Sequence, residues 1–154
     1  SLDFTMLDCE NSKKVVKLVE HEFLTPYGLR TLSQNDFRYK NEYTGLAKER
    51  DLSYHNGTVW PWLIGPFITA YLKVWGNNLE KRKFAESLLA LFFGQQLYQY
   101  GLGTINEIFT GQEPHAPRGC IAQAWSVAEI LRSYLEDILQ IRPKYEQEVF
   151  QYSL

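Results

Sequence analysis

Four segments of this chain repeat apolar residues at intervals of three and four, and two long stretches lack that repeat. The repeat places apolar side chains on one face of an α-helix, which predicts helices over these ranges: 11–24, 58–75, 79–99 and 120–140. The other two stretches, 25–57 and 101–119, are rich in Gly, Asn, Asp and Pro, and loops of this length usually carry function. No segment alternates as a strand does. The pattern predicts an all-α chain that forms one domain, residues 1–154.

Capping residues and helix breakers set the expected helix ends. A residue of the pair 11–12 (Asn-Ser) can cap the first helix, and one asparagine of the pair 77–78 can cap the third, because their side-chain oxygens accept from the first N–H groups of a helix. Pro66 lacks an N–H, so a kink or a restart is expected inside the second helix. Pro143 is expected to end the fourth helix.

The charge balance and the cysteines exclude several classes of protein. With 16 basic and 18 acidic side chains the net charge is −2, and nucleic acids or anionic membrane surfaces would favour a strong basic excess. No apolar run is long enough to span a membrane, and no signal peptide is visible. Cys9 and Cys120 form neither a disulfide framework nor a metal-type spacing, which favours a reducing cytoplasm.

The long loops contain candidate groups for acid–base chemistry. Glu107 lies between Ile105 and Ile108 and competes with other loop carboxylates, which are Asp36, Asp51 and Glu113. Spacing alone favours a solvated role for a single loop glutamate. His55 and His115 have no second His or Cys at a ligand spacing, so no metal site is predicted. No phosphate loop or dinucleotide motif is present, so no organic cofactor is expected.

Aromatic residues are abundant, with 4 Trp, 10 Tyr and 9 Phe. A core of large side chains is one explanation. A sugar-binding surface is the other, because the apolar faces of sugars stack on aromatic rings. Trp60 and Trp62 lie closer to a predicted loop than Trp75 does, so a sugar platform is more plausible at those two positions.

Two segments resemble signatures of the C-terminal, amylo-α-1,6-glucosidase part of glycogen debranching enzymes. The first is YHNGTVWPWLIGPF at 54–67, and the second is EIF at 107–109 followed by PHAPRGCIAQAWSVAE at 114–129. The segments YGLRTLS at 27–33 and RD at 50–51 are also similar to that family. The resemblance covers about residues 24 to 135, and segments this long and unusual are highly specific.

The resemblance implies an (α/α)6 toroid, a double ring of twelve helices, of which this chain would form the last third with about four helices. It implies inverting hydrolysis of α-1,6-glucosidic branch points in glycogen or related α-glucans. The glutamate of the EIF segment is the general base in that reading, and it corresponds to Glu107. The general acid would come from an earlier helix–loop unit, and no position of this chain matches it.

The same resemblance implies a set of substrate-binding residues around Glu107. Hydroxyl groups of the glucan would bond to polar side chains, Trp60 would form a stacking wall, and Gln123 would support the loop. The full set is Arg30, Asp51, Tyr54, His55, Asn56, Trp60, His115 and Gln123.

Other interpretations remain open. The chain is also compatible with another six-hairpin glucosidase that acts on α-1,4 or trehalose-type bonds. The missing acid favours a third interpretation, in which these residues form a non-catalytic glucan-binding or assembly fragment. An isolated third of a toroid would expose faces that other helices cover, so self-association is expected.

Overall fold

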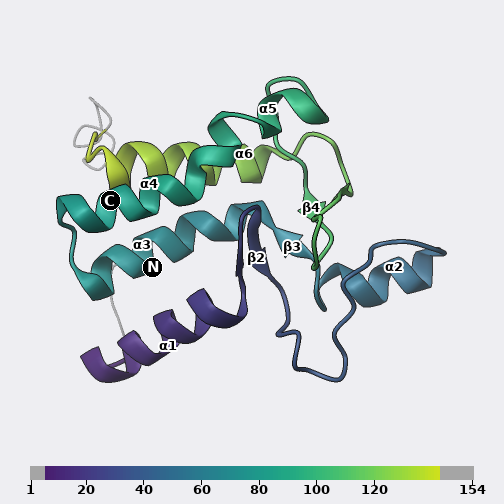
Figure 1. The fold of residues 1–154 in the computed structure, drawn as a ribbon, viewed down its shortest axis with the longest axis horizontal. Coiled ribbons are helices and arrows are strands. Elements are labelled where there is room, and N and C mark those ends of the chain that lie inside the picture. The colour runs from purple at the N-terminus through teal and green to yellow at the C-terminus, as the bar shows by residue number, and fades with distance from the viewer. Residues whose placement is uncertain (1–5, 143–154) are drawn as a thin grey trace, which may run out of the picture.

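The structure is a computed structural model that describes residues 6–142, and it is mostly helical, as the sequence predicts. Figure 1 shows the long helices side by side at one end of the molecule and a separate helix at the other end, with short strands between these two parts. The helices are α1 (Cys9–Glu22), α2 (Ala47–Tyr54), α3 (Ile64–Trp75), α4 (Leu79–Phe93), α5 (Gln96–Gln99) and α6 (Ala124–Arg132). A 3₁₀ turn at Pro61–Leu63 precedes α3, and a π-helical segment at Ser133–Ile138 continues α6.

The core is centred on α3, which contacts α1, α4, α6 and the π-helical segment. The apolar spacing of α3 buries both Ile64 and Ile68 completely, and these residues pack with Leu89, Phe92 and Ile130 from the neighbouring helices. Six of the 12 residues of this helix are buried, and Lys73 is its one exposed residue. The helices therefore form a rigid layer on which the loops are mounted.

The N-terminal ends of two helices differ from the predicted ones. Asp8 caps α1, because its carboxylate accepts from the N–H of Asn11 at 2.8 Å, so the expected cap at residues 11–12 is wrong. Asn78 caps α4 as predicted and accepts from the N–H of Lys81 at 3.0 Å. The helix expected from residue 58 begins only at Ile64. Pro66 consequently lies in its first turn, where a missing N–H costs no hydrogen bond, and the kink expected there is not needed.

Two further predicted helix ends also differ. The helix expected to reach residue 99 ends at Phe93, and the short α5 follows after Gly94. The helix expected from residue 120 begins at Ala124. The predicted end at Pro143 lies outside the described residues.

A small antiparallel sheet contradicts the expectation that the chain has no strands. Its strands are β1 (Leu24–Thr25), β2 (Gly28–Arg30), β3 (Val59–Trp60), β4 (Ile108–Phe109) and β5 (Pro117–Arg118), and they pair in sequence order. Each strand has two or three residues, too few to display an alternating pattern. The sheet joins the two regions that were predicted as separate loops, because β3 pairs with β4 at Val59 and Phe109.

Helix α2 is the second element that the sequence did not predict. It lies within the presumed loop 25–57, and its one buried residue is Ser53. With no apolar stripe, α2 gives no helical period to detect. Among the residues that the structure describes, none of the helices is both long and apolar enough to cross a membrane.

Candidate active site

The pairing of β4 with β5 determines where Glu107 lies. Ile108 pairs with Arg118, so Glu107, just before β4, lies opposite the residues just after β5. The backbone N–H of Glu107 donates to the carbonyl of Cys120 at 2.9 Å. In return, the N–H of Cys120 donates to Oε2 of the Glu107 side chain at 2.8 Å. Main-chain pairing therefore fixes both the backbone and one carboxylate oxygen of Glu107.

The second carboxylate oxygen is held by a different segment. The hydroxyl of Tyr54, the last residue of α2, donates to Oε1 of Glu107. The backbone carbonyl of Tyr54 accepts from the Oγ1 of Thr58 at 2.7 Å and from the indole Nε1 of Trp60 at 3.0 Å. Residues in and next to β3 thus hold Tyr54 in place. Tyr54 in turn joins the stretch 25–57 to the stretch 101–119 at the Glu107 carboxylate.

The two neighbours of Glu107 are kept protonated by their surroundings. Burial raises the pKa of the Tyr54 phenol, and the hydrogen bond to Glu107 raises this pKa further. The negative charge of Glu107 raises the pKa of the Cys120 thiol. Each effect disfavours a second negative charge beside the carboxylate. At neutral pH Tyr54 is therefore a hydrogen-bond donor, and Cys120 is a neutral thiol.

Aromatic rings surround Tyr54. The Tyr54 ring lies edge-on to Trp60 with centroids 4.8 Å apart, and the His55 ring stacks on Trp60 at 5.2 Å with an interplanar angle of 11°. Tyr43 contacts the Tyr54 ring at 5.5 Å. Trp60 itself is only 6% exposed. Most of its surface is therefore engaged by protein groups, and His55 offers more accessible surface to a ligand at this position.

The remaining residues predicted from the resemblance occupy distinct places. The Nε of Arg30 donates to the carbonyl of Gly111 at 2.7 Å, so this side chain braces the loop after β4. The side chain of Asn56 donates to the carbonyl of Leu52 at 2.8 Å, within its own turn. Asp51 is exposed on α2, one helical turn before Tyr54.

His115 and Gln123 support the second loop. His115 is 5% exposed, and its Nδ1 lies 2.8 Å from the carbonyl of Thr110. A carbonyl can only accept, so Nδ1 carries the proton. The His115 ring also contacts Tyr27, which stacks on Phe109 of β4. The N–H of Gln123 donates to the carbonyl of Ile105 at 2.9 Å, which joins the start of α6 to the segment before Glu107.

Sequence reasoning missed Gly119 and the main-chain N–H of Cys120. Gly119 has a φ of 67°, and a Cβ at this position would overlap the carboxylate of Glu107. Glycine is the residue that adopts this backbone conformation without strain and also leaves room for a close approach. The Arg-Gly-Cys sequence contained that signal, but only the structure shows what approaches the glycine.

The site contains one carboxylate with two donors. Within residues 6–142, the side-chain hydrogen-bond partners of Glu107 are Tyr54 and Cys120, and neither is a carboxylic acid. No group of three or more His, Cys, Asp or Glu side chains in the described part of the chain is arranged to hold a metal ion. A carboxylate held in this way can accept a proton from a water molecule, because each oxygen keeps an unused lone pair.

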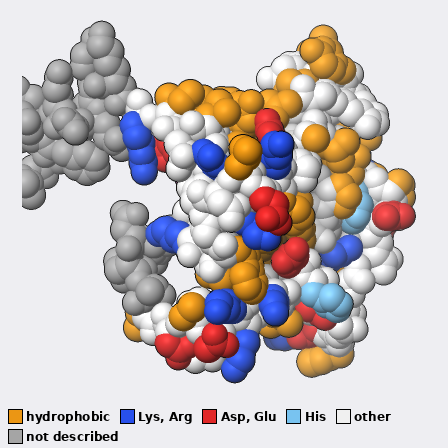
Figure 2. Space-filling view, turned by 60° about the vertical axis from the view of Figure 1, so that its left-hand side comes forward, with side chains coloured by type: hydrophobic (Ala, Val, Ile, Leu, Met, Phe, Trp, Pro, Cys, Tyr) orange, Lys and Arg blue, Asp and Glu red, His pale blue; other side chains and the backbone are white. Residues whose placement is uncertain are grey.

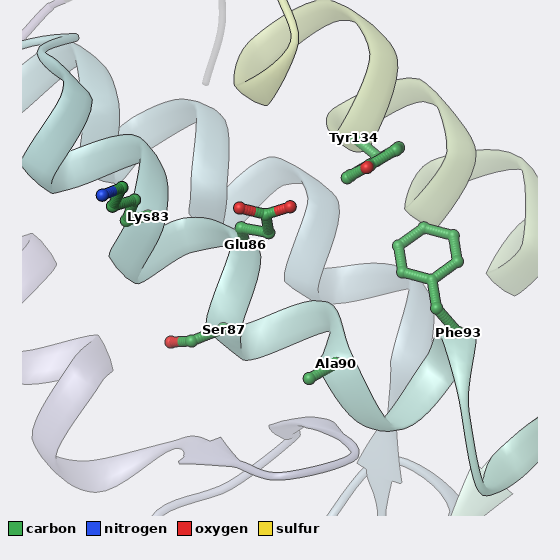
Figure 3. A pocket seen from close by; sticks show the side chains of 6 residues that line it. All are labelled: Lys83, Glu86, Ser87, Ala90, Phe93 and Tyr134. Carbon is green, nitrogen blue, oxygen red and sulfur yellow. The ribbon is translucent and has the colours of Figure 1, made fainter.

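A separate hollow lies on the outer face of α4, where Phe93 and Tyr134 face one another with ring centroids 4.8 Å apart (Figure 3). The hollow is open and mostly apolar, and its lining residues are Lys83, Glu86, Ser87, Ala90, Phe93 and Tyr134. Glu107, Tyr54 and Cys120 are not among its lining residues, so the hollow is separate from the candidate site.

Comparison with known proteins identifies the class of the chain. A mostly helical scaffold that presents a held loop carboxylate beside aromatic rings fits a glycoside hydrolase. The chain belongs to the amylo-α-1,6-glucosidase family, which it matches over residues 1–132. It is also 29% identical over 68 residues to the glycogen debranching enzyme of Saccharomyces cerevisiae. That match covers 40% of this chain and 4% of the yeast protein, so the chain spans a small part of that relative.

Proposed function

We propose that this chain forms part of a glycogen-debranching catalytic domain that hydrolyses α-1,6-glucosidic branch points with inversion, and that Glu107 is its general base. Membership of the amylo-α-1,6-glucosidase family supports the reaction. The observation that carries the assignment of the base is the fixed carboxylate of Glu107, which receives hydrogen bonds on both oxygens from two distant segments.

In the proposed reaction Glu107 removes a proton from a water molecule as that water attacks the anomeric carbon. A carboxylic acid on the other side of the sugar protonates the departing glycosidic oxygen. In inverting enzymes the two carboxyl groups lie roughly 6.5–9.5 Å apart, which leaves room for the water. The acid belongs to another part of the protein, as in the (α/α)6 arrangement, because no residue of this chain matches it.

The ligand in this proposal is an α-glucan such as glycogen or its limit dextrin. His55 supports this, because its ring stacks on Trp60 and is exposed next to Tyr54. Asp51 is exposed on the same helix as Tyr54 and is available for a sugar hydroxyl. A cytoplasmic location is part of the same proposal, since Cys9 and Cys120 are both free thiols, which suits a reducing compartment.

The substitution Glu107→Gln tests the base directly in the full-length protein that contains this chain. The amide keeps the shape of the side chain but cannot accept a proton, so we expect glucose release from limit dextrin to fall by about 10²- to 10⁴-fold. Glu113→Gln is the matched control, because Glu113 is exposed in the same loop and the variant should retain activity. Near-normal hydrolysis by Glu107→Gln would show that another residue is the base.

Two alternative functions can be distinguished from this one by experiment. A six-hairpin glucosidase with another linkage preference would share the base, and comparing hydrolysis rates on isomaltose-type and maltose-type substrates separates it from a debranching enzyme. A non-catalytic glucan-binding or assembly role is favoured by the absence of a matching acid in this chain. Glucan binding without hydrolysis by the full-length protein would support that role.

A further inference from the structure

The two hydrogen bonds to Glu107 come from different kinds of group, a backbone N–H and a side-chain hydroxyl. Cys120, two residues after β5, holds Oε2 through its backbone N–H. Tyr54 holds Oε1 through a side chain whose residue is 53 positions away in sequence. A carboxylate fixed at one oxygen can still rotate about its terminal torsion, which is broad and soft. The hydroxyl of Tyr54 is therefore the contact that sets the orientation of the second oxygen.

Tyr54 is itself held by hydrogen bonds to its backbone and by contacts of its ring. Its carbonyl accepts two hydrogen bonds, from Thr58 and Trp60. Its ring contacts Tyr43, His55 and Trp60. A phenol has one O–H to donate, and here that proton is used on Glu107. The hydroxyl of Tyr54 is consequently not available as a donor to a sugar.

We propose that Tyr54 is a positioning residue for Glu107, which aims the carboxylate at the attacking water, and is not a ligand of the glucan. This inference rests on the proposed role of Glu107 as the base. It replaces the expectation that Tyr54 binds substrate, and it predicts different kinetics. Loss of a substrate contact raises KM, whereas loss of a positioning contact lowers kcat.

Tyr54→Phe in the full-length protein tests the kinetic part. The variant keeps the ring and removes the donor, so we expect kcat on limit dextrin to fall about ten- to a hundredfold, as for loss of a hydrogen bond to a charged group, with KM nearly unchanged. A donor favours the charged form of a carboxylate, so the acidic limb of the pH–rate profile should move to higher pH. Tyr134→Phe is the matched control, because Tyr134 lies on the separate hollow.

A second measurement does not depend on activity. The charge of Glu107 raises the pKa of the Cys120 thiol, and Cys120 is exposed, so its alkylation by iodoacetamide reports where the carboxylate is. The reaction can be followed across pH by mass spectrometry of the peptide that contains Cys120. Glu107→Gln should shift this alkylation profile to lower pH. Tyr54→Phe should shift it in the same direction by a smaller amount, because the carboxylate can then rotate while the N–H of Cys120 still holds its Oε2.

The outcomes separate this inference from the proposed function. If Glu107→Gln is active, the base assignment fails. If Glu107→Gln is inactive while Tyr54→Phe keeps wild-type kcat, or leaves the Cys120 profile unchanged, only the positioning role is overturned. An increase in KM alone would restore Tyr54 as a substrate ligand.

A mono-fluorinated tyrosine at position 54 provides the rescue experiment. It also tests the proposal if Tyr54→Phe does not fold. It keeps the ring and the hydroxyl, so kcat should stay near the wild-type value. Fluorine makes the phenol more acidic and a stronger donor, so the acidic limb should move to lower pH. A loss of kcat as large as that of Tyr54→Phe, or an acidic limb that does not move, would overturn the proposal.

Discussion

A single residue, Gly119, affects the geometry around Glu107, because a side chain at position 119 would overlap the carboxylate. Gly119 and Gly103 both have positive φ values, 67° and 70°. A Cβ at Gly119 would meet the Glu107 carboxylate, whereas a Cβ at Gly103 has nothing within 4 Å. The two positions share the backbone demand and differ only in what surrounds them. They therefore allow backbone strain and displacement of the carboxylate to be measured separately.

Gly119→Ala should impair both stability and activity, while Gly103→Ala should impair stability alone. Each alanine in this backbone region costs about 1–2 kcal/mol of folding free energy. The added methyl group of Gly119→Ala must also push the Glu107 side chain away from the N–H of Cys120, so hydrolysis should fall well beyond the loss of folded protein. Denaturant unfolding and limit-dextrin hydrolysis of both full-length variants measure the two effects. Equal activities would mean that the methyl group is accommodated without moving Glu107.

The identity of residues alone could not have selected this site. Glu107 was one of several loop carboxylates until the resemblance distinguished it. One of its donors is the backbone N–H of Cys120. Every residue except proline has such a group, so the residue type does not reveal this hydrogen bond. Tyr54 was expected from the resemblance, but as a sugar ligand. Its contact with Glu107 depends on a separation of 53 residues closing in space, and no local pattern encodes that closure.

At the scale of elements, Arg132 links three parts of the helical layer. Its guanidinium donates to Oε2 of Glu129 at 3.0 Å, to Oδ2 of Asp137 at 3.2 Å and to the hydroxyl of Thr69 at 3.1 Å. These residues belong to α6, the π-helical segment and α3. The two carboxylates are only 20% and 18% exposed, so this cluster is more than a surface ion pair.

Arg132→Met should destabilise the fold, because it leaves two partly buried carboxylates together without their cation. We expect a loss of about 1–3 kcal/mol in the free energy of unfolding, measured by denaturant titration at pH 7. Lys13→Met removes an exposed pair with Glu10 and should cost less than about 1 kcal/mol. Equal losses for the two variants would contradict the structural role of Arg132.

The predictability of each element follows its apolar content. The spacing of apolar residues located α3 and α4, because burial of one face creates the period. It failed for α2, whose buried residue is Ser53, and for the five strands, which are too short to show alternation. Pro66 was placed in a helix correctly, but the start of that helix was set too early because strand β3 and the 3₁₀ turn before it are also apolar.

At the scale of the whole molecule, many apolar side chains remain on the surface. Figure 2 shows hydrophobic patches on one face, interrupted by charged groups. The exposed large residues in the second half of the chain include Phe93, Tyr98, Leu102, Ile121, Trp125, Leu131, Leu135 and Leu139. Such surface commonly marks a contact with other protein.

The 154-residue chain, expressed alone, should therefore self-associate. Static light scattering across a concentration series should give a mass that rises above 18.0 kDa. The double variant Leu131→Lys and Leu135→Lys places charges on side chains that are 47% and 42% exposed and should shift the mass toward the monomer. Phe37→Lys places a charge on an exposed side chain in the stretch 25–57 and serves as the control. A well-behaved monomer at all concentrations would contradict the expectation.

The sheet that carries Glu107 also has a kinetic consequence. The backbone hydrogen bonds of an α-helix join residues four apart, whereas the candidate site depends on pairs such as Arg30 with Gly111, which are 81 residues apart. Closing such long loops costs chain entropy before any contact rewards it. Single helices can therefore form early in folding, and the carboxylate acquires its orientation only when the most distant parts of the chain have met.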